Sequence, residues 1–217
     1  ENLILKATSY GIKRIYKYGS SGDYFSMMAD PTGWFVVIFD SKGTKYSTKL
    51  IGKYNLNNIT TALCIGKYFG VEEKNAYDAV SNYKPSNNRS QLKEIKTNMV
   101  IMDAYNANPS SMKAALKNFS GIKAENKMII IGDMLELGVL SIEMHEKIGE
   151  LLNTLSVGKV IFCGTEMEHA FKKYTNGKYF STIGLLKIWM QENPIQNTTI
   201  LIKASRDMAL EKVVEWI

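Results

Sequence analysis

From residue 99 onward, the chain alternates short apolar runs with longer segments in which apolar residues recur at helical spacing. The runs have the length of buried strands, and the segments between them have the length of amphipathic helices. This alternation, with short connections, predicts right-handed βαβ units and a mostly parallel sheet covered by helices on both faces. The predicted strands are 99–103, 127–132, 159–164, 179–181 and 199–203, and the predicted helices are 110–119, 141–155, 166–174, 183–192 and 208–216.

The first 84 residues carry a different pattern, in which aromatic and β-branched runs are separated by glycine-containing turns. Such runs and turns predict antiparallel strands joined as a meander. Two helices should follow, at 57–69 and 72–82, and Gly70 stands where a glycine commonly ends a helix. The predicted strands are 14–18, 24–29, 34–40 and 44–50, with turns at 19–23, 30–33 and 40–43.

A polar run that contains a proline, residues 83–88, separates the two patterns and is the expected domain boundary. The expected fold class is α/β. Residues 85–217 should form the mostly parallel sheet with flanking helices, preceded in 1–84 by an antiparallel β and helical part.

Composition and charge narrow the class of protein. The 217 residues are 45% hydrophobic and 22% charged, which is typical of a globular chain. The 27 Lys and Arg against 21 Asp and Glu give a formal charge of +6, but the bases are isolated or paired. We therefore expect no nucleic-acid partner. Alternatively, the excess positive charge could line a cleft that binds a small polyanionic ligand such as a nucleotide.

We also do not expect a membrane protein, a secreted protein or a metal-binding protein. No apolar run approaches the ~18–20 residues of a membrane helix, and the N-terminus has no leader pattern. Cys64 and Cys163 stand far apart, which predicts reduced, buried thiols in a cytoplasmic protein. The two histidines lie near no CxxC, so no metal site is expected.

Ligands of parallel sheets bind beyond the carboxyl ends of the strands. The segment 103–111, Asp-Ala-Tyr-Asn-Ala-Asn-Pro-Ser-Ser, follows the first parallel strand and opens a helix. Asn108 or Ser110 could cap that helix, with the proline in its first turn. Capping explains one asparagine or serine, whereas an aspartate, a tyrosine and two asparagines together favour a binding site. The carboxylate suits ribose hydroxyls, and the amides suit phosphate or carboxylate oxygens.

Two further segments stand at strand ends. Residues 132–138, Gly-Asp-Met-Leu-Glu-Leu-Gly, form either a loop with two solvated acids or a close backbone approach to a ligand. Residues 203–206, Lys-Ala-Ser-Arg, are either a receiver of carboxylate or phosphate or a capping serine with surface bases. His145, beside an apolar helical stripe, is expected to be structural. The sequence contains no G-x-x-x-x-G-K-[ST] phosphate loop.

Taken in order, these segments resemble the Mur ligases, the ATP-dependent amide ligases that build the bacterial cell-wall precursor. Residues 103–112 and 132–138, the latter followed by Ser141 and His145, resemble the subfamily that adds D-alanyl-D-alanine to UDP-N-acetylmuramoyl-tripeptide. Residues 52–58 resemble the family's Gly-x-His-Asn-x-x-Asn, and residues 203–211 its Lys-Gly-Ser-Arg-x-Met-x-Leu-Glu. Asn88-Arg89 resembles the Gly-Arg of its hinge. The departures are Tyr54 for histidine, and Asn88 and Ala204 for glycine.

The resemblance implies a three-domain ligase with ATP and Mg²⁺ as cofactors. Residues 1–84 would be the end of the central ATP-binding domain, and 85–217 the C-terminal Rossmann-like domain. The UDP-sugar domain, the phosphate loop and the magnesium-bridging modified lysine would lie upstream. The chain is therefore expected to be a fragment, inactive alone, monomeric, and without a metal site of its own.

The resemblance also implies roles for individual residues. The ATP site would include Asn55, Asn58, Arg89 and Asp103. The reaction centre would include Asn106 and Asn108. The D-alanyl-D-alanine carboxylate would be bound by Lys203, Ser205 and Arg206. The partners would be that dipeptide and UDP-N-acetylmuramoyl-tripeptide. Another Mur-type ligase, a folylpolyglutamate synthase and a non-catalytic nucleotide-binding module are the alternatives; Tyr-Asn-Ala-Asn-Pro argues against the two enzymes.

Overall fold

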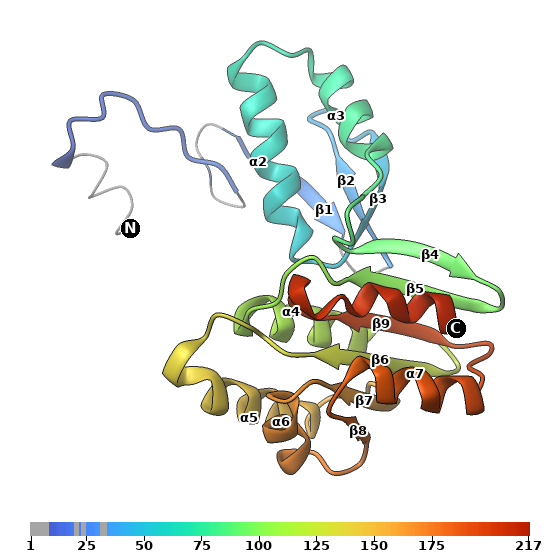
Figure 1. Cartoon of the computed structure of the whole chain (residues 1–217). Coiled ribbons are helices and arrows are strands. Elements are labelled where there is room, and N and C mark those ends of the chain that lie inside the picture. The colour runs from blue at the N-terminus through green and yellow to red at the C-terminus, as the bar shows by residue number, and fades with distance from the viewer. Residues whose placement is uncertain (1–8, 20–21, 23–24, 31–33) are drawn as a thin grey trace. The chain divides into compact units, whose positions relative to one another are not determined.

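The structure is a computed structural model that describes residues 9–19, 22, 25–30 and 34–217 (Figure 1). The chain divides into two units. The first lies within Glu1–Lys49 and Lys53–Tyr83, and the second comprises Leu50–Gly52 and Lys84–Ile217.

The first unit contains a three-stranded sheet and two helices. The strands β1 (Met28–Asp30), β2 (Phe35–Phe39) and β3 (Lys45–Ile51) lie in that order, with β1 antiparallel to β2. A tight hairpin joins β2 to β3: the Asp40 N–H donates to the Thr44 carbonyl at 3.1 Å, and Gly43 has φ +82°. That positive φ in a three-residue loop favours glycine. The sequence prediction of this hairpin is confirmed.

Both predicted helices of this unit are present as α2 (Asn55–Tyr68) and α3 (Glu73–Asn82). Gly70, with φ +75°, follows the end of α2, and its N–H donates to the Lys67 carbonyl at 3.1 Å. Glycine ends helices in this way because it has no Cβ to clash in the left-handed conformation.

The predicted strand at 14–18 is wrong. Only Tyr18 takes part in a bridge, an isolated one to Phe25, and β1 begins at Met28 rather than at residue 24. Aromatic and β-branched residues favour strands only where a neighbouring strand and a buried face are available. Ile15 and Tyr16 are exposed instead. Residues 20–21, 23–24 and 31–33 of the predicted strand and turns lie outside the described residues.

The second unit is built on a six-stranded sheet with the order β4-β5-β9-β6-β7-β8. The pairs β5–β9, β9–β6, β6–β7 and β7–β8 are parallel, and β4 is antiparallel to β5. The predicted, mostly parallel sheet is therefore confirmed. Its strands are β4 (Gln91–Ile95), β5 (Asn98–Asp103), β6 (Lys127–Gly132), β7 (Lys159–Cys163), β8 (Lys178–Phe180) and β9 (Thr199–Lys203).

Helices cover both faces of this sheet. Figure 1 shows α7 (Ile183–Glu192) and the 3₁₀ helix η3 (Leu210–Trp216) on the near face. Leu186 of α7 and Leu210 of η3 join one buried cluster with alternate residues of the central strands, including Val100 and Ile202. The intervening strand residues point the other way. That other face is covered by α4 (Pro109–Gly121), α5 (Ser141–Leu152) and α6 (Met167–Lys173).

Two elements of this unit differ from the predictions. The strand β4 was not predicted, because Gln91–Ile95 is a polar, half-buried edge strand whose hairpin turn has Lys96 at φ +52° where glycine or asparagine is usual. The predicted helix 208–216 is instead two 3₁₀ helices, η2 (Arg206–Met208) and η3, divided by Ala209 at φ +48°.

The connections create a crevice at the carboxyl ends of β5 and β9. The chain leaves β5 toward α4 on one face of the sheet, and it leaves β9 toward η3 on the other. Two adjacent parallel strands whose following segments go to opposite faces leave such a crevice between them, and this is where α/β sheets bind ligands.

Gly164, directly after β7, is required by close packing. A Cβ at this residue would lie 2.4 Å from the Asp133 carboxyl carbon, and φ is +119°. We expect Gly164→Ala to lower the free energy of unfolding by about 2 kcal/mol or more, because strain and overlap act together. Urea unfolding followed by circular dichroism measures the change.

Gly184→Ala is the matched control. This residue lies in α7, has an ordinary helical φ, and the nearest atom to its Cβ would be 3.8 Å away. Alanine favours helices over glycine, so stability should stay equal or rise by up to about 1 kcal/mol. Equal losses in the two variants would contradict the packing argument.

Candidate functional site

A buried ion pair joins the carboxyl ends of β5 and β9. Lys203 Nζ lies 2.7 Å from Asp103 Oδ2, and the two side chains are 2% and 16% exposed, respectively. Lys203 Nζ also donates to the Asn106 carbonyl at 3.2 Å. The lysine thus binds both the strand end and the loop that follows it. Lys203 is therefore not a surface base, and its predicted binding of a ligand carboxylate stays a prediction.

The second carboxylate oxygen of Asp103 binds the segment before β4. Asp103 Oδ1 accepts from the Ser90 N–H at 3.0 Å and from its hydroxyl at 3.4 Å. Asn87, Asn88 and Ser90 all have φ between +50° and +56°. Such left-handed conformations are unfavourable for residues other than glycine and persist only where surrounding contacts hold them. Asp103 supplies such a contact.

Two exposed guanidinium groups lie over one aromatic ring. Arg89 Cζ is 3.8 Å from the centroid of the Tyr105 ring, and Arg206 Cζ is 5.4 Å from it. Contact with the ring face stabilises each cation and limits its motion. Two arginines that come from distant parts of the sequence therefore concentrate positive charge beside Tyr105.

The loop after β6 is fixed at three successive residues. The Ser205 N–H donates to the Asp133 carbonyl at 3.0 Å, the Met134 N–H donates to His145 Nε2 at 3.0 Å, and the Leu135 N–H donates to Ser205 Oγ at 2.8 Å. Ser205 is at the N-cap position of η2, but its hydroxyl is used on this loop rather than as a cap.

His145 is fully buried and has a structural role, as the sequence predicted. Because its Nε2 accepts a backbone N–H, its proton lies on Nδ1, which is 2.8 Å from the Ser141 carbonyl. Asp133 is also buried, and its carboxylate accepts the Met167 N–H at 2.8 Å at the start of α6. Burial raises the pKa of Asp133. The prediction of two solvated acids in this loop is wrong for Asp133 and holds for Glu136, which is exposed.

A pocket of about 240 Å³ opens between these loops. Asn106, Glu136 and Arg206 contribute polar side chains to its walls, together with Tyr105, Leu135, Ser205 and Asp207. The sequence prediction included Asn106, Ser205 and Arg206 as site residues, but it gave no role to Tyr105 or Glu136. Tyr105 was present in the Tyr-Asn-Ala-Asn-Pro signal, whereas nothing in the sequence indicated the backbone conformation of Glu136.

The two asparagines predicted for the reaction centre make local contacts. Asn108 caps α4, since its Oδ1 accepts from the Ser111 N–H at 2.8 Å. The capping alternative is thus confirmed for this residue. Asn106 Oδ1 accepts from the Ala107 N–H at 2.8 Å, and its side chain lines the pocket.

The remaining predicted residues, Asn55 and Asn58, belong to the first unit. They lie in the first turn of α2, where Asn58 Nδ2 donates to Asn55 Oδ1 at 3.0 Å. Asn55 is buried and Asn58 is exposed.

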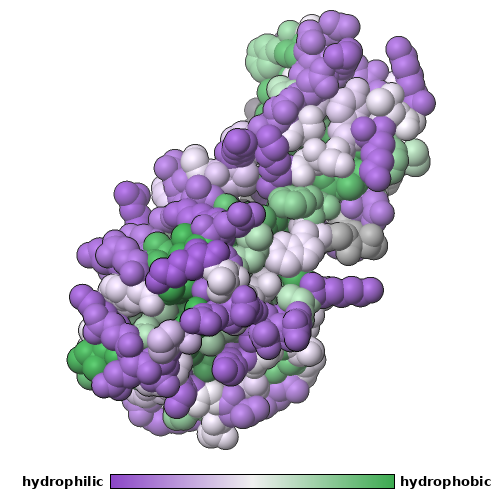
Figure 2. All heavy atoms as spheres, turned by 90° about the vertical axis from the view of Figure 1, so that its right-hand side faces the viewer, coloured by the Kyte–Doolittle hydropathy of each residue, from purple (hydrophilic) through white to green (hydrophobic). Residues whose placement is uncertain are grey.

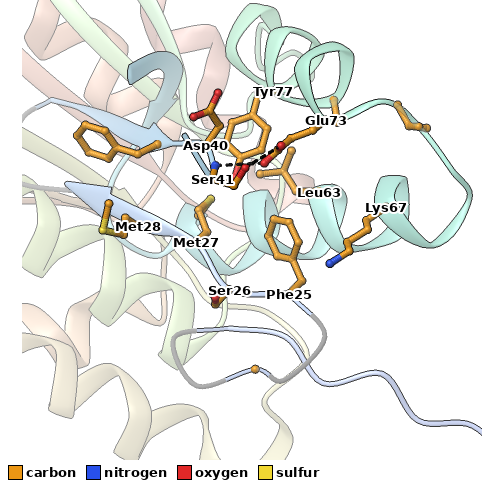
Figure 3. A pocket seen from close by; sticks show the side chains of 14 residues that line it. Phe25, Ser26, Met27, Met28, Asp40, Ser41, Leu63, Lys67, Glu73 and Tyr77 are labelled. Carbon is orange, nitrogen blue, oxygen red and sulfur yellow. Dashed lines mark hydrogen bonds between the residues drawn. The ribbon is translucent and has the colours of Figure 1, made fainter. Parts of the chain in front are cut away.

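A cavity of about 660 Å³ in the first unit contains none of the predicted residues (Figure 3). Its polar groups are used within the unit: the Glu73 carboxylate accepts from the Ser41 N–H at 3.1 Å and from the Ser41 hydroxyl at 2.9 Å. Asp40 accepts from the N–H groups of Lys42 and Thr44 at 2.9 and 2.8 Å. These contacts support the β2–β3 turn, so we do not assign this cavity to the chemistry.

Three further findings concern the described part of the chain. No group of three or more His, Cys, Asp or Glu there could hold a metal ion. No helix there is long and apolar enough to cross a membrane. Hydrophilic side chains cover most of the face in Figure 2, with hydrophobic ones in separate patches.

The mostly parallel sheet with helices on both faces defines a Rossmann-like α/β domain. Residues 88–206 match the family model described as Mur ligase, glutamate ligase domain. That match covers more than half of the chain, which therefore belongs to the Mur ligase family.

Known relatives agree with this family. The chain is 34% identical over 178 residues to the UDP-N-acetylmuramoyl-tripeptide--D-alanyl-D-alanine ligase of Bacillus subtilis, a match covering 76% of this chain and 38% of the relative. It is similar in fold to MurF from Acinetobacter baumannii, with a TM-score of 0.79, 24% identity, and coverage of 96% of this chain and 48% of the other. It is also similar in fold to MurF ligase from Thermotoga maritima in complex with ADP, with a TM-score of 0.76, 22% identity, and coverage of 100% and 51%. The chain thus spans about half of these proteins or less.

The ion pair between Asp103 and Lys203 predicts a strong coupling in stability. Lys203→Met leaves a poorly exposed carboxylate without its cation, so we expect the free energy of unfolding to fall by about 3 kcal/mol. Adding Asp103→Asn removes that unpaired charge, so the double variant should regain much of the loss. A double-mutant cycle by urea unfolding measures the coupling; additive effects of the two substitutions would contradict it.

Proposed function

We propose that the full-length protein is an ATP-dependent amide ligase that joins D-alanyl-D-alanine to UDP-N-acetylmuramoyl-tripeptide. The observation that carries the proposal is the 34% identity to a curated ligase of that name. Two segments that resemble this subfamily, residues 103–112 and 132–138, supply walls of the charged pocket. The proposal therefore assigns these two subfamily segments and the pocket that they line to one activity.

In this reaction ATP phosphorylates the terminal carboxylate of the tripeptide to give an acyl phosphate. The amino group of the dipeptide attacks the acyl carbon after its ammonium form has lost a proton to solvent. The tetrahedral intermediate then expels phosphate and loses a second proton to give the amide, and ADP is the product of the first step. Such chemistry depends chiefly on positioning and on neutralising phosphate charge. The exposed guanidinium group of Arg89, which lies over the Tyr105 ring, is suited to neutralising phosphate charge.

We assign residues of the second unit to two ligands. Asp103 would bind the ribose hydroxyls of ATP and Arg89 its phosphates, and Arg206 would bind the dipeptide carboxylate beside the backbone of Ser205. Lys203, buried in its ion pair, would act by holding Asp103 in place rather than by touching the dipeptide. Asn106 would line the reaction centre from the pocket wall, and Asn108 would hold the start of α4.

We assign Asn55 and Asn58 of the first unit to the adenine side of ATP. Residues 1–84 would then be the end of the central ATP-binding domain, residues 85–217 the C-terminal domain, and residues 83–88 the hinge between them. The phosphate loop and the UDP-sugar domain would belong to the rest of the protein. The MurF ligase from Thermotoga maritima, which is similar in fold, was solved in complex with ADP, and this supports a nucleotide as ligand.

The metal and the cellular setting follow from the same proposal. Mg²⁺ would neutralise the ATP phosphates, and we assign its protein ligands mainly to the rest of the protein. A UDP-linked substrate and ATP suit a cytoplasmic enzyme, which we expect to be a monomer.

The activity is tested with the full-length protein, ATP, UDP-N-acetylmuramoyl-tripeptide and D-alanyl-D-alanine. We expect phosphate release that requires both amide-forming substrates, and a product whose mass equals their sum minus one water. The 217-residue chain alone should give no turnover. Amide formation with glutamate on a folate acceptor, but not with these substrates, would contradict the proposal.

The assignment of Arg206 gives a second prediction. Arg206→Ala removes a cation from the proposed dipeptide site, so the KM for D-alanyl-D-alanine should rise about 10-fold or more, and the KM for ATP should change little. Steady-state kinetics with each substrate varied in turn makes the comparison. A larger rise in the KM for ATP would contradict this assignment and indicate that Arg206 binds the nucleotide instead.

A further inference from the structure

The pocket beyond β5 and β9 carries charges of both signs on opposite loops. Arg206 comes from the segment after β9, and Glu136 comes from the loop after β6. Within the described chain, no ion pair of 4.0 Å or less joins Glu136 to Arg206 or Arg89. Both charges are therefore left for a ligand that carries the complementary pair.

Glu136 is held in its place by the backbone. The three residues before it, 133 to 135, are each fixed by a hydrogen bond to Ser205 or His145. Glu136 itself has φ +65°, a conformation that a long side chain adopts only where the surrounding structure imposes it. Glycine or asparagine would adopt this positive φ with less strain, but the chain has a glutamate here. The hydrogen-bonded loop thus presents an exposed carboxylate at the pocket wall.

The pocket, of about 240 Å³, has room for a small ligand such as a dipeptide. A small ligand with one cationic and one anionic end is an unblocked short peptide.

We propose that Glu136 binds the α-ammonium group of the incoming dipeptide while Arg206 binds its carboxylate. Glu136 is then the residue by which the site selects a free amino end over a blocked one. This inference rests on the proposed function, because it deepens the assignment of the dipeptide site. Asp207 also lines the pocket, but it adjoins Arg206 in η2 and so lies at the same end as the carboxylate-binding cation.

The test combines a change in the ligand with a change in the protein. Binding of D-alanyl-D-alanine and of N-acetyl-D-alanyl-D-alanine to the full-length protein is measured by calorimetry, for the wild type and for Glu136→Gln. We expect the wild type to bind the free dipeptide at least about 10-fold more tightly than the acetylated one, since acetylation removes the charge-assisted hydrogen bond to Glu136. Glu136→Gln should abolish that preference by weakening only the free dipeptide.

Controls separate the ammonium role from a general effect on the pocket. Glu143→Gln removes a carboxylate of α5 that is paired with Lys147 outside the pocket, and it should leave the preference unchanged. Glu136→Asp keeps the charge and should keep part of the preference. Asp207→Asn should also leave the preference intact; if it abolishes the preference instead, Asp207 is the ammonium-binding residue and our inference is wrong.

The outcomes also distinguish this inference from the proposed function. Equal binding of the two dipeptides by the wild type, or an equal loss for both in Glu136→Gln, would overturn the role of Glu136 while ligase turnover with D-alanyl-D-alanine continued. Failure of the proposed function would appear differently, as absence of that turnover in the full-length protein. A preference that disappears only in Glu136→Gln, with Glu143→Gln unchanged, supports the inference.

Discussion

The ion pair between Asp103 and Lys203 is the contact on which the site depends. Removing two charges from water is costly, and a well-packed apolar pair of similar volume is often at least as stable. The pair therefore contributes more to position than to stability. It links the last residues of two adjacent parallel strands and, through the Asn106 carbonyl and the Ser90 N–H, the two segments that carry Tyr105 and Arg89.

A second anchor acts in the same way on the opposite side of the crevice. Ser205 is buried, and its backbone and hydroxyl hold the loop after β6 at Asp133 and Leu135. Arg206 is the next residue, so the contact that fixes this loop also fixes the start of η2. The buried Ser205 thus holds the exposed charges of Arg206 and Glu136 at the pocket.

The sequence predicted what local patterns determine and missed what depends on distant contacts. Continuous apolar runs gave the parallel strands β6 and β9 with correct bounds, because both faces of such strands are buried. The edge strand β4 was missed because its half-exposed residues are polar. The ion pair of Asp103 joins residues 100 positions apart, so no spacing rule could distinguish a ligand-binding Lys203 from a buried one. Within residues 103–111 the capping interpretation is confirmed for Asn108, whereas ligand binding by this segment stays a prediction, with Asn106 and Tyr105 lining the pocket.

The titratable groups beneath the pocket explain why this part of the protein is suited to binding rather than to proton transfer. His145 is held as a neutral ring by two backbone groups, and Asp133 is used at the start of α6. Burial raises the pKa of Cys163 to about 12, so its thiol stays protonated and unreactive. The charged side chains that line the pocket are the guanidinium group of Arg206 and the carboxylates of Glu136 and Asp207, and Arg89 lies beside them over the Tyr105 ring. The proposed acyl-phosphate mechanism would require that its partners be aligned and their charges balanced, and fixed charges on hydrogen-bonded loops would meet that requirement without reorganisation during the reaction.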